Sequence, residues 1–295
     1  MERNNKHLNM LNKIIGKIAE GVEMETHVIV TSDHHINSTV SLCVPSMNLD
    51  DGGTYRASRP QRALYESWCD MWQEVGRLPG RKIAVLNGDL GELDTKRRTT
   101  QLVTHNKATI MALVLETLTP MLEVVDKVIV IRGTMAHEGK SQWLEEAIAK
   151  DLDNTIPDTH TQSWYHCRAE IAGLKFDLAH HTGMGRLPWT EKNAANKLAV
   201  QVTYHYLSGL RQPVPDIAIR SHNHRYADSG GNFDVFALCT RAWTLKTEYV
   251  YRIGGELSIS DIGGHLFSIR DGAYSYDPNK FRYEPKAGRV WALKI

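Results

Sequence analysis

The chain has 295 residues, 42% of them hydrophobic, which suits one large α/β domain with a sizeable core. Its formal net charge of +1 excludes a protein held to nucleic acid or membrane by overall charge, although a local basic groove stays compatible with it. The four cysteines are far apart and form no C-x-x-C pair, so we expect free thiols in a reducing compartment. Without a bilayer-length apolar stretch or a signal-like N-terminus, we expect a cytoplasmic protein with no membrane partner.

The first segment predicts a short amphipathic helix. Between residues 5 and 20 four apolar side chains recur on one face, with lysines opposite: Leu8, Leu11, Ile15 and Ile18. We expect residues 1–24 to pack as a helix on a single domain of residues 25–295, with a dimer or partner contact as the alternative. Residues 36–61 show turn residues and no periodicity, which predicts a long loop. Further helices are expected at residues 62–77, 99–125, 142–152 and 189–210, the second of them kinked or divided at Pro120.

Five short β-branched runs predict buried strands, and each ends at a residue that can bind a metal ion. The strands are expected at residues 27–32, 82–87, 127–132, 175–179 and 216–221. They alternate with helices, which favours right-handed crossovers and a largely parallel sheet. Sites in such sheets lie beyond the carboxyl ends of the strands. From about residue 233 onward, short strands with Gly-rich turns predict an antiparallel set that forms or extends a second sheet.

The residues after these strands are those of a transition-metal site. Asp33 and His35 are two positions apart, as are His222 and His224, so in an extended chain each pair would point to one side. The D-x-H and G-D motifs alone are weak, whereas H-x-H after an apolar strand is stronger, because two imidazoles so spaced rarely serve a core. Together, the strand ends would gather imidazoles and carboxylates in the number and mix that favour a centre for two ions: Asp33, His35, Asp89, His137, His180, His222 and His224.

The order of these motifs resembles the calcineurin-like metallophosphoesterase superfamily, whose pattern is D-x-H, G-D-x-x-[DE], G-N-H-[DE], H and G-H-x-H. The chain matches it with Asp33 and His35, Gly88-Asp89-Leu90-Gly91-Glu92, His180, and His222 with His224. Three further segments resemble the phosphoesterases encoded by bacteriophages and prophages. They are Asp51-Gly52-Gly53, the turn from Arg132 to His137, and Trp243-Thr244-Leu245-Lys246-Thr247.

This resemblance implies a four-layer αββα sandwich with two mixed β-sheets and two divalent metal ions at the carboxyl ends of the strands. Manganese is the first expectation, with iron, zinc or nickel as alternatives. By analogy with the family, one ion would be held by Asp33, His35 and His224, and the second by His180 and His222. Asp89 would bridge the two ions. His181 stays open as a substitute for His180.

The chain departs from the family at G-N-H-[DE]. Thr134 follows Gly133, and the nearest histidine is His137. His137 would then be the general acid, with Thr134 or a water in the place of the Asn, or it would itself be a ligand of the second ion. Arg132, beside this turn, is a candidate for binding substrate phosphate, and an ordinary ion-paired arginine is the alternative.

The expected function is that of a metal-dependent phosphoesterase, which hydrolyses a phosphomono- or diester with a hydroxide activated by two metal ions. One alternative is a DNA-repair-type nuclease of the same superfamily, with nucleic acid as its partner. Its basic path would use Lys96-Arg97-Arg98 or Arg56, Arg59 and Arg62. Another is a non-catalytic metal-binding scaffold. A phage-encoded protein would act in the host cytoplasm. The substrate and the oligomeric state stay open.

Overall fold

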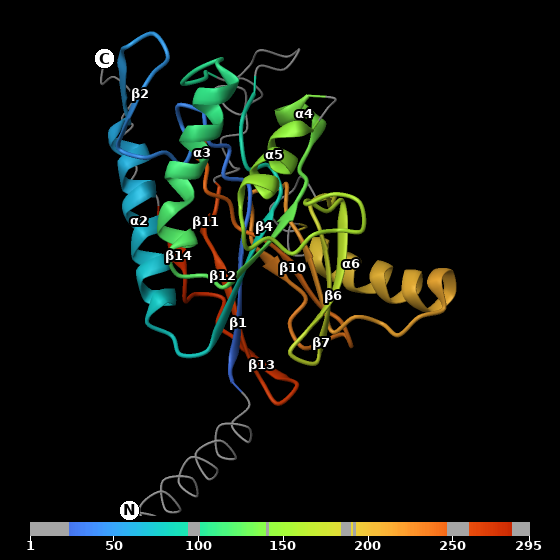
Figure 1. Cartoon of the computed structure of the whole chain (residues 1–295). Helices are drawn as coiled ribbons and strands as arrows, with labels where there is room; N and C mark the ends of the chain where they lie inside the picture. The colour runs from blue at the N-terminus through green and yellow to red at the C-terminus, as the bar shows by residue number, and fades with distance from the viewer. Residues whose placement is uncertain are drawn as a thin grey trace, which may run out of the picture.

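The computed structural model describes residues 24–93, 101–139, 142–183, 190, 193–246 and 260–284. Two five-stranded sheets lie face to face, and helices cover the outer face of each one (Figure 1). The predicted four-layer αββα sandwich with two mixed sheets is therefore confirmed. Within these ranges, no helix combines the length and the apolar character that crossing a membrane requires. The amphipathic helix predicted for residues 1–24 lies almost entirely outside the described residues.

The first sheet is built around three parallel strands that the β-branched runs predicted. They are β1 (Thr26–Thr31), β4 (Arg81–Asn87) and β5 (Lys127–Ile131). Alternate residues face opposite layers. Val28 and Val30 pack against the second sheet, whereas Ile29 packs against the helices. The antiparallel hairpin of β12 (His265–Arg270) and β13 (Ala273–Tyr276) extends this sheet beside β1.

The second sheet has the order β6-β7-β8-β10-β9. Its strands are β6 (His166–Ile171), β7 (Leu174–Ala179), β8 (Ile217–Arg220), β10 (Phe236–Cys239) and β9 (Ala227–Asp228). β7, β8 and β10 are parallel neighbours. The expectation of an antiparallel C-terminal set that forms or extends a second sheet is confirmed in part, because β12 pairs antiparallel with β13 and β10 with β9. β10 runs parallel to β8 in this sheet, whereas the later β12–β13 hairpin joins the first. The strands expected at 257–259 and 290–293 lie outside the described residues.

The helices mostly follow the predicted ranges. α2 (Arg59–Gly76) begins with a capping box made by Ser58 and Gln61. α3 (Lys107–Leu122) begins later than predicted because Asn106 caps it, and Pro120 lies in its last turn without dividing it. The remaining helices are α4 (Met135–Glu138), α5 (Trp143–Asp151), α6 (Asn193–Tyr204) and the π-helix η2 (His205–Leu210). Two short antiparallel strand pairs complete the fold, β2 (Ser46–Asn48) with β3 (Thr54–Arg56) and β11 (Ile262–Gly263) with β14 (Arg282–Tyr283).

Candidate metal centre

The loops that follow five strands meet at one end of the sandwich, between the edges of the two sheets. Backbone pairing continues beyond the strands: Asp33 N–H donates to the Gly88 carbonyl at 3.0 Å, and His35 N–H donates to the Asp89 carbonyl at 3.0 Å. Across the second sheet, Ser221 N–H donates to the His180 carbonyl at 2.7 Å. These bonds hold the predicted site residues of each sheet in register with their neighbours in the same sheet.

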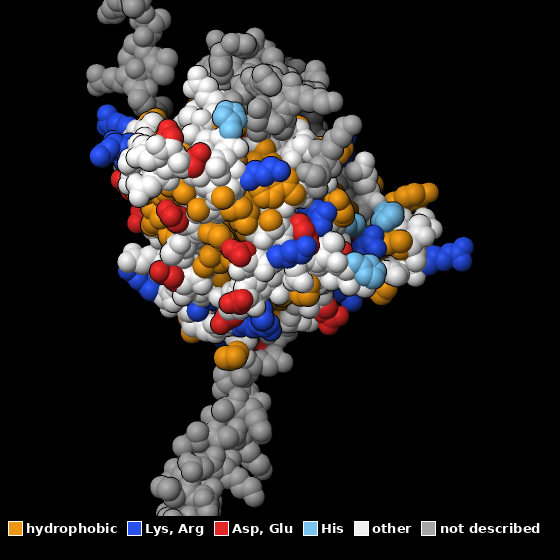
Figure 2. Space-filling model, turned by 45° about the horizontal axis from the view of Figure 1, so that its top comes forward, with side chains coloured by type: hydrophobic (Ala, Val, Ile, Leu, Met, Phe, Trp, Pro, Cys, Tyr) orange, Lys and Arg blue, Asp and Glu red, His pale blue; other side chains and the backbone are white. Residues whose placement is uncertain are grey.

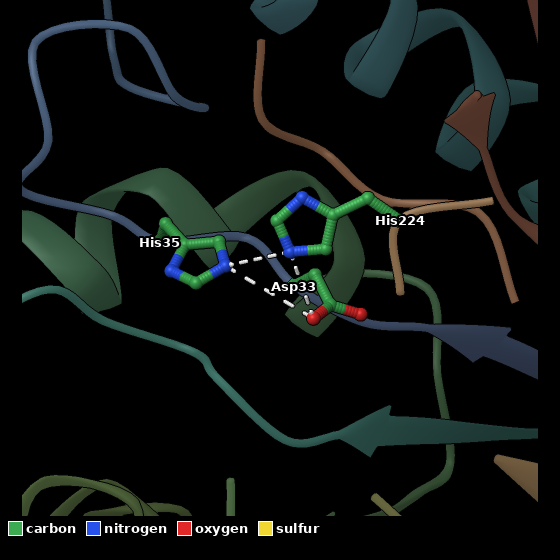
Figure 3. Close-up of side chains that lie close together, drawn as sticks. All are labelled: Asp33, His35 and His224. Atoms are coloured by element: carbon green, nitrogen blue, oxygen red, sulfur yellow. Dashed lines mark hydrogen bonds and ion pairs between the residues drawn. The ribbon is translucent and has the colours of Figure 1, made fainter. Parts of the chain in front are cut away.

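The first group of potential ligands consists of Asp33, His35 and His224, which point toward one another (Figure 3). Asp33 Oδ1 lies 3.2 Å from His224 Nε2, 3.9 Å from His180 Nε2 and 4.0 Å from His35 Nε2. This oxygen is buried and accepts no hydrogen bond from the described residues. A buried carboxylate oxygen with imidazole nitrogens around it and no donor is the arrangement that a cation completes.

The second group consists of Asp89, His180 and His222. Asp89 Oδ2 lies 3.0 Å from His180 Nε2 and 3.9 Å from His222 Nδ1. Asp89 Oδ1 accepts hydrogen bonds from Thr134 N–H at 2.5 Å and from Thr134 Oγ1 at 3.0 Å. Thr134 therefore contacts the carboxylate directly, in the part of the turn where the family motif has its Asn. The side chains of His222 and His224 are 38% and 26% exposed, so the centre opens to solvent on their side.

In His180 and His35 the Nδ1 atom donates a hydrogen bond. The lone pair on Nε2 of each ring therefore faces a second atom that also accepts. His180 Nδ1 lies 2.7 Å from the Asn87 carbonyl, which only accepts, so Nδ1 carries a hydrogen. In the neutral ring the lone pair is then on Nε2, 3.0 Å from Asp89 Oδ2. His35 Nδ1 donates to Glu92 Oε2 at 3.0 Å in the same way, and its Nε2 faces His224 Nε2 at 3.2 Å. Two acceptors at such distances need a shared proton or a metal ion, so the donor set fits divalent cations.

The backbone at the centre is left-handed. φ is 50° at Asp33, 45° at His35, 51° at Asp89, 77° at His222 and 57° at His224. The expectation that the D-x-H and H-x-H pairs lie in extended chain is therefore wrong, because turns rather than strand alternation aim these side chains inward. Positive φ is uncommon outside glycine and costs about 1–3 kcal/mol where the surroundings enforce it. Half of the ten non-glycine residues described with positive φ are predicted ligands, which is typical of a functional site.

Two glycines are required by the close approach of ligand side chains. A Cβ at Gly88, where φ is +87°, would lie 2.3 Å from His180 Nδ1. A Cβ at Gly133 would lie 2.1 Å from Asp89 Oδ1. Any larger residue would displace these side chains, so the glycines of the G-D and G-T motifs make room for the centre.

Glu92 links His35 of the first group to His137, and it was matched to the superfamily pattern without a role. Its Oε2 accepts from His35 Nδ1 at 3.0 Å and from His137 Nδ1 at 2.7 Å. His137 stands on the one-turn helix α4, and its Nε2 lies 3.7 Å from Asp89 Oδ2. Glu92 with these histidines is a third possible ligand group, but the short carboxylate contacts identify it as a hydrogen-bonded relay. The acid three positions after Asp89 was the signal in the sequence.

Burial and the mixture of charges shift the pKa values in opposite directions. Burial alone would raise the pKa of Asp33 and Asp89, but the neighbouring imidazoles hold both well below the ordinary value. Burial would lower the pKa of His180, yet the Asp89 carboxylate raises it to about 10. His137 is likewise raised to about 9 by its hydrogen bond to Glu92 and the charge of Asp89, against its burial. The carboxylates of the centre therefore stay ionised and stabilise a positive charge placed beside them, including the proton of a neighbouring imidazole.

A pair of acids lies behind the centre. Glu138 and Glu145 are almost fully buried, and both oxygens of Glu138 lack a hydrogen-bond partner among the described residues. Glu145 Oε1 accepts from the N–H groups of Leu90 and Gly133 at 3.3 Å each. Burial and the charge of Glu145 raise the pKa of Glu138 to about 12, and burial also raises that of Glu145. Sequence reasoning did not single out this pair, because Glu145 on a predicted helix and Glu138 in the turn before it carry no pattern.

The structure thus brings Asp33, His35, Asp89, His180, His222 and His224 together, with His137 beside them. His181 is exposed, and its ring packs beside His180 and His222. The Arg132 guanidinium donates to Ser163 Oγ, Tyr165 Oη and Glu146 Oε2 at 2.8, 2.9 and 3.1 Å. Its predicted contact with substrate phosphate stays a prediction.

Comparison with known proteins gives only weak similarities. No family model and no curated protein matches the chain. Among solved structures it is similar to Vps29 of Entamoeba histolytica complexed with Zn²⁺ (14% identity, 85% of this chain and 97% of that chain, TM-score 0.34). It is also similar to Vps29 of Chaetomium thermophilum (11%, 83% and 82%, 0.38) and to the calcineurin-like phosphoesterase YfkN of Bacillus subtilis (10%, 86% and 88%, 0.37). These similarities are too weak to assign a function.

Proposed function

We propose that the protein is a metal-dependent phosphoesterase. The observation that carries the proposal is the pair of adjoining ligand groups, in which buried carboxylate oxygens and imidazole lone pairs face one another at 3.0–3.2 Å. Nitrogen and oxygen ligands in this mixture suit manganese, iron, zinc or nickel. The resemblance of the motif order to the calcineurin-like superfamily supports the same reading.

In this proposal Asp33, His35 and His224 hold one ion, and Asp89, His180 and His222 hold another. Bound divalent ions would lower the pKa of a coordinated water and offset charge on the phosphoryl oxygens. The chain's own contribution is orientation. The Asn87 carbonyl fixes the tautomer of His180, and Glu92 fixes that of His35. Thr134 fixes the rotamer of Asp89 through two hydrogen bonds to Oδ1.

His137 is the proposed general acid. Its Nδ1 donates to Glu92, which leaves Nε2 directed toward Asp89 on the partly exposed side of the centre. In the protein without ions, the hydrogen bond to Glu92 and the charges of Asp89 and Glu92 raise the pKa of this ring to about 9. A protonated imidazole at this edge can give its Nε2 proton to a leaving alkoxide.

A nuclease is a narrower version of the same proposal. On the face in Figure 2, which shows this end of the sandwich turned toward the viewer, Lys and Arg side chains lie among acidic and hydrophobic ones. Arg56, Arg59 and Arg62 are exposed, whereas residues 96–98 lie outside the described residues. The described part of this face therefore gives no specific reason to prefer DNA over a smaller ester.

The test is metal analysis of the purified protein together with turnover of bis-p-nitrophenyl phosphate in added manganese. We expect bound transition metal and manganese-dependent release of p-nitrophenol. Bound metal without turnover on a broad phosphoester panel would favour the non-catalytic scaffold instead. Salt-sensitive binding of DNA would select the nuclease among the esterases.

A further inference from the structure

Arg132 belongs to a closed network that holds one exposed aromatic ring. Its three kinds of side-chain nitrogen each have a partner: Nε donates to Ser163, Nη1 to Tyr165 and Nη2 to Glu146. Glu146 is fixed in turn by Ser163 Oγ at 2.6 Å and by an ion pair with Lys150 at 3.3 Å. The Arg132 side chain is only 9% exposed. Its charge is therefore balanced within the network, and the group that it presents to solvent is Tyr165.

Tyr165 is unusual among the large side chains because it is both fixed and exposed. The Arg132 guanidinium carbon lies 4.5 Å from the centroid of the ring, and its Nη1 bonds the phenol oxygen, so one face and the polar end are occupied. The residue is nevertheless 62% exposed, which requires the other face of the ring to be open to solvent. An aromatic ring with a cation behind it and a free face in front is the arrangement that stacks on a second flat ring.

The position of Tyr165 places it at the rim of the metal centre. The Trp164 carbonyl accepts from Arg132 N–H at 2.7 Å, which joins this segment to the end of β5 next to Gly133. His166 pairs with Ala179 across β6 and β7, so Tyr165 lies one residue beyond that pair, toward His180. Its backbone therefore lies beside Arg132, where β5 leads into the turn that carries Thr134, and beside the end of β7 that leads to His180.

We propose that the open face of Tyr165 stacks on a flat ring of the substrate, so that the preferred phosphoester carries a nucleobase or a similar aromatic group. This inference rests on the proposed function and names the substrate class of the same centre. The network through Arg132 and Glu146 makes the ring rigid before the substrate arrives, which removes the entropy cost of ordering it on binding. Arg132 is then a positioning residue that acts through Tyr165.

The experiment compares two esters with the same scissile bond and the same leaving group. Thymidine 5′-(p-nitrophenyl phosphate) has a base, whereas methyl p-nitrophenyl phosphate has none. For the manganese-loaded protein we expect kcat/KM to favour the thymidine ester. Tyr165→Ala should reduce that preference about tenfold, as expected for one base–aromatic stack, with most of the change in KM. Tyr165→Phe keeps the ring and should retain most of the preference.

Tyr204→Ala is the matched control, because Tyr204 is 71% exposed on α6 and should leave the ratio of the two esters unchanged. Binding of thymidine 5′-monophosphate against inorganic phosphate, measured by calorimetry, gives a readout independent of turnover. An unchanged ratio and unchanged relative binding in Tyr165→Ala would overturn this inference and leave the phosphoesterase proposal intact. Hydrolysis of neither ester by the wild-type protein, together with no turnover of p-nitrophenyl phosphate or of thymidine 5′-monophosphate, would overturn both.

Discussion

Two buried carboxylate clusters in this protein show how a structural ion pair differs from a metal centre. Asp177, in the middle of β7, accepts from Arg220 Nη2 at 2.6 Å, Tyr206 Oη at 2.7 Å and His166 Nε2 at 2.8 Å. Both of its oxygens have donors, and a permanent cation balances its charge. Asp33 has an oxygen without a donor, and the groups that lower its pKa are imidazoles. The first cluster is complete as folded, whereas the second has a carboxylate oxygen that a cation would complete.

The sharpest test of this comparison is the same substitution in each cluster. Asp89→Asn should lower turnover by more than about a hundredfold, since loss of a ligand exceeds the usual cost of losing an outer hydrogen bond, and should lower bound metal. Asp177→Asn should instead reduce the free energy of unfolding by about 3 kcal/mol and leave metal content per folded protein unchanged. Metal analysis, turnover and denaturant unfolding of both variants measure this. Equal loss of bound metal in Asp89→Asn and Asp177→Asn would show that the two clusters do not differ in this way.

The second prediction concerns His137 within the metal centre. His137→Gln should slow hydrolysis of an ester with an alkoxide leaving group about a hundredfold, because such a group needs a proton. An ester of p-nitrophenol should be much less affected. His160→Gln, on an exposed loop, is the matched control. Steady-state rates on the two esters decide the role. Equal slowing of both, with a loss of bound metal, would make His137 a ligand instead.

The third prediction is the pH dependence of stability after chelation. The pKa of His180 is raised to about 10 and that of His137 to about 9, from an ordinary 6.5. Their protonation stabilises the folded state fully below about pH 6.5, and this contribution is lost as the pH rises toward 10. The chelated protein should therefore lose thermal stability across this window, and the manganese-loaded protein should lose less, because ions replace the protons. Parallel thermal melts of both forms measure it. Identical pH profiles of the two forms would contradict the idea that metal ions replace these protons.

The smallest expected effect is at Glu138. Because its pKa is raised to about 12, this acid takes up a proton on folding at any pH above its ordinary 4.5, which costs stability that grows as the pH rises. Glu138→Gln removes the uptake, so it should be neutral or stabilising by about 1 kcal/mol at neutral pH, with less benefit near pH 4.5. Denaturant unfolding of both proteins at the two pH values measures this. A clear destabilisation would show that Glu138 is ionised and paired with a cation.

Much of the centre could be predicted from the sequence because its ligands directly follow strands. The apolar runs ending at Thr31, Asn87 and Ala179 are recognisable from composition, and parallel strands bring their carboxyl ends to one end of the sandwich. The alternation of strands and helices predicted an α/β fold, and the four-layer arrangement was what the family resemblance implied.

The remaining features depend on contacts between distant segments. Asp33 and His35 were expected in extended chain, but pairing with the loop after β4 imposes left-handed turns. The partners of Arg132 include Ser163 and Tyr165, which are more than thirty residues away, so no local pattern could reveal them. The direction of β10 depends on which neighbour it pairs with, and short apolar runs do not specify that.

The left-handed backbone also limits which side chains can replace the present ones at these positions during evolution. Asp, Asn and His are the side chains that tolerate such a backbone most readily after glycine, and all three coordinate metals. Cys and Glu coordinate as well but lack that tolerance. Substitutions that change metal preference should therefore be limited to Asp, Asn and His at five positions: Asp33, His35, Asp89, His222 and His224. Glycine at any of them would preserve the loop conformation but remove the ligand.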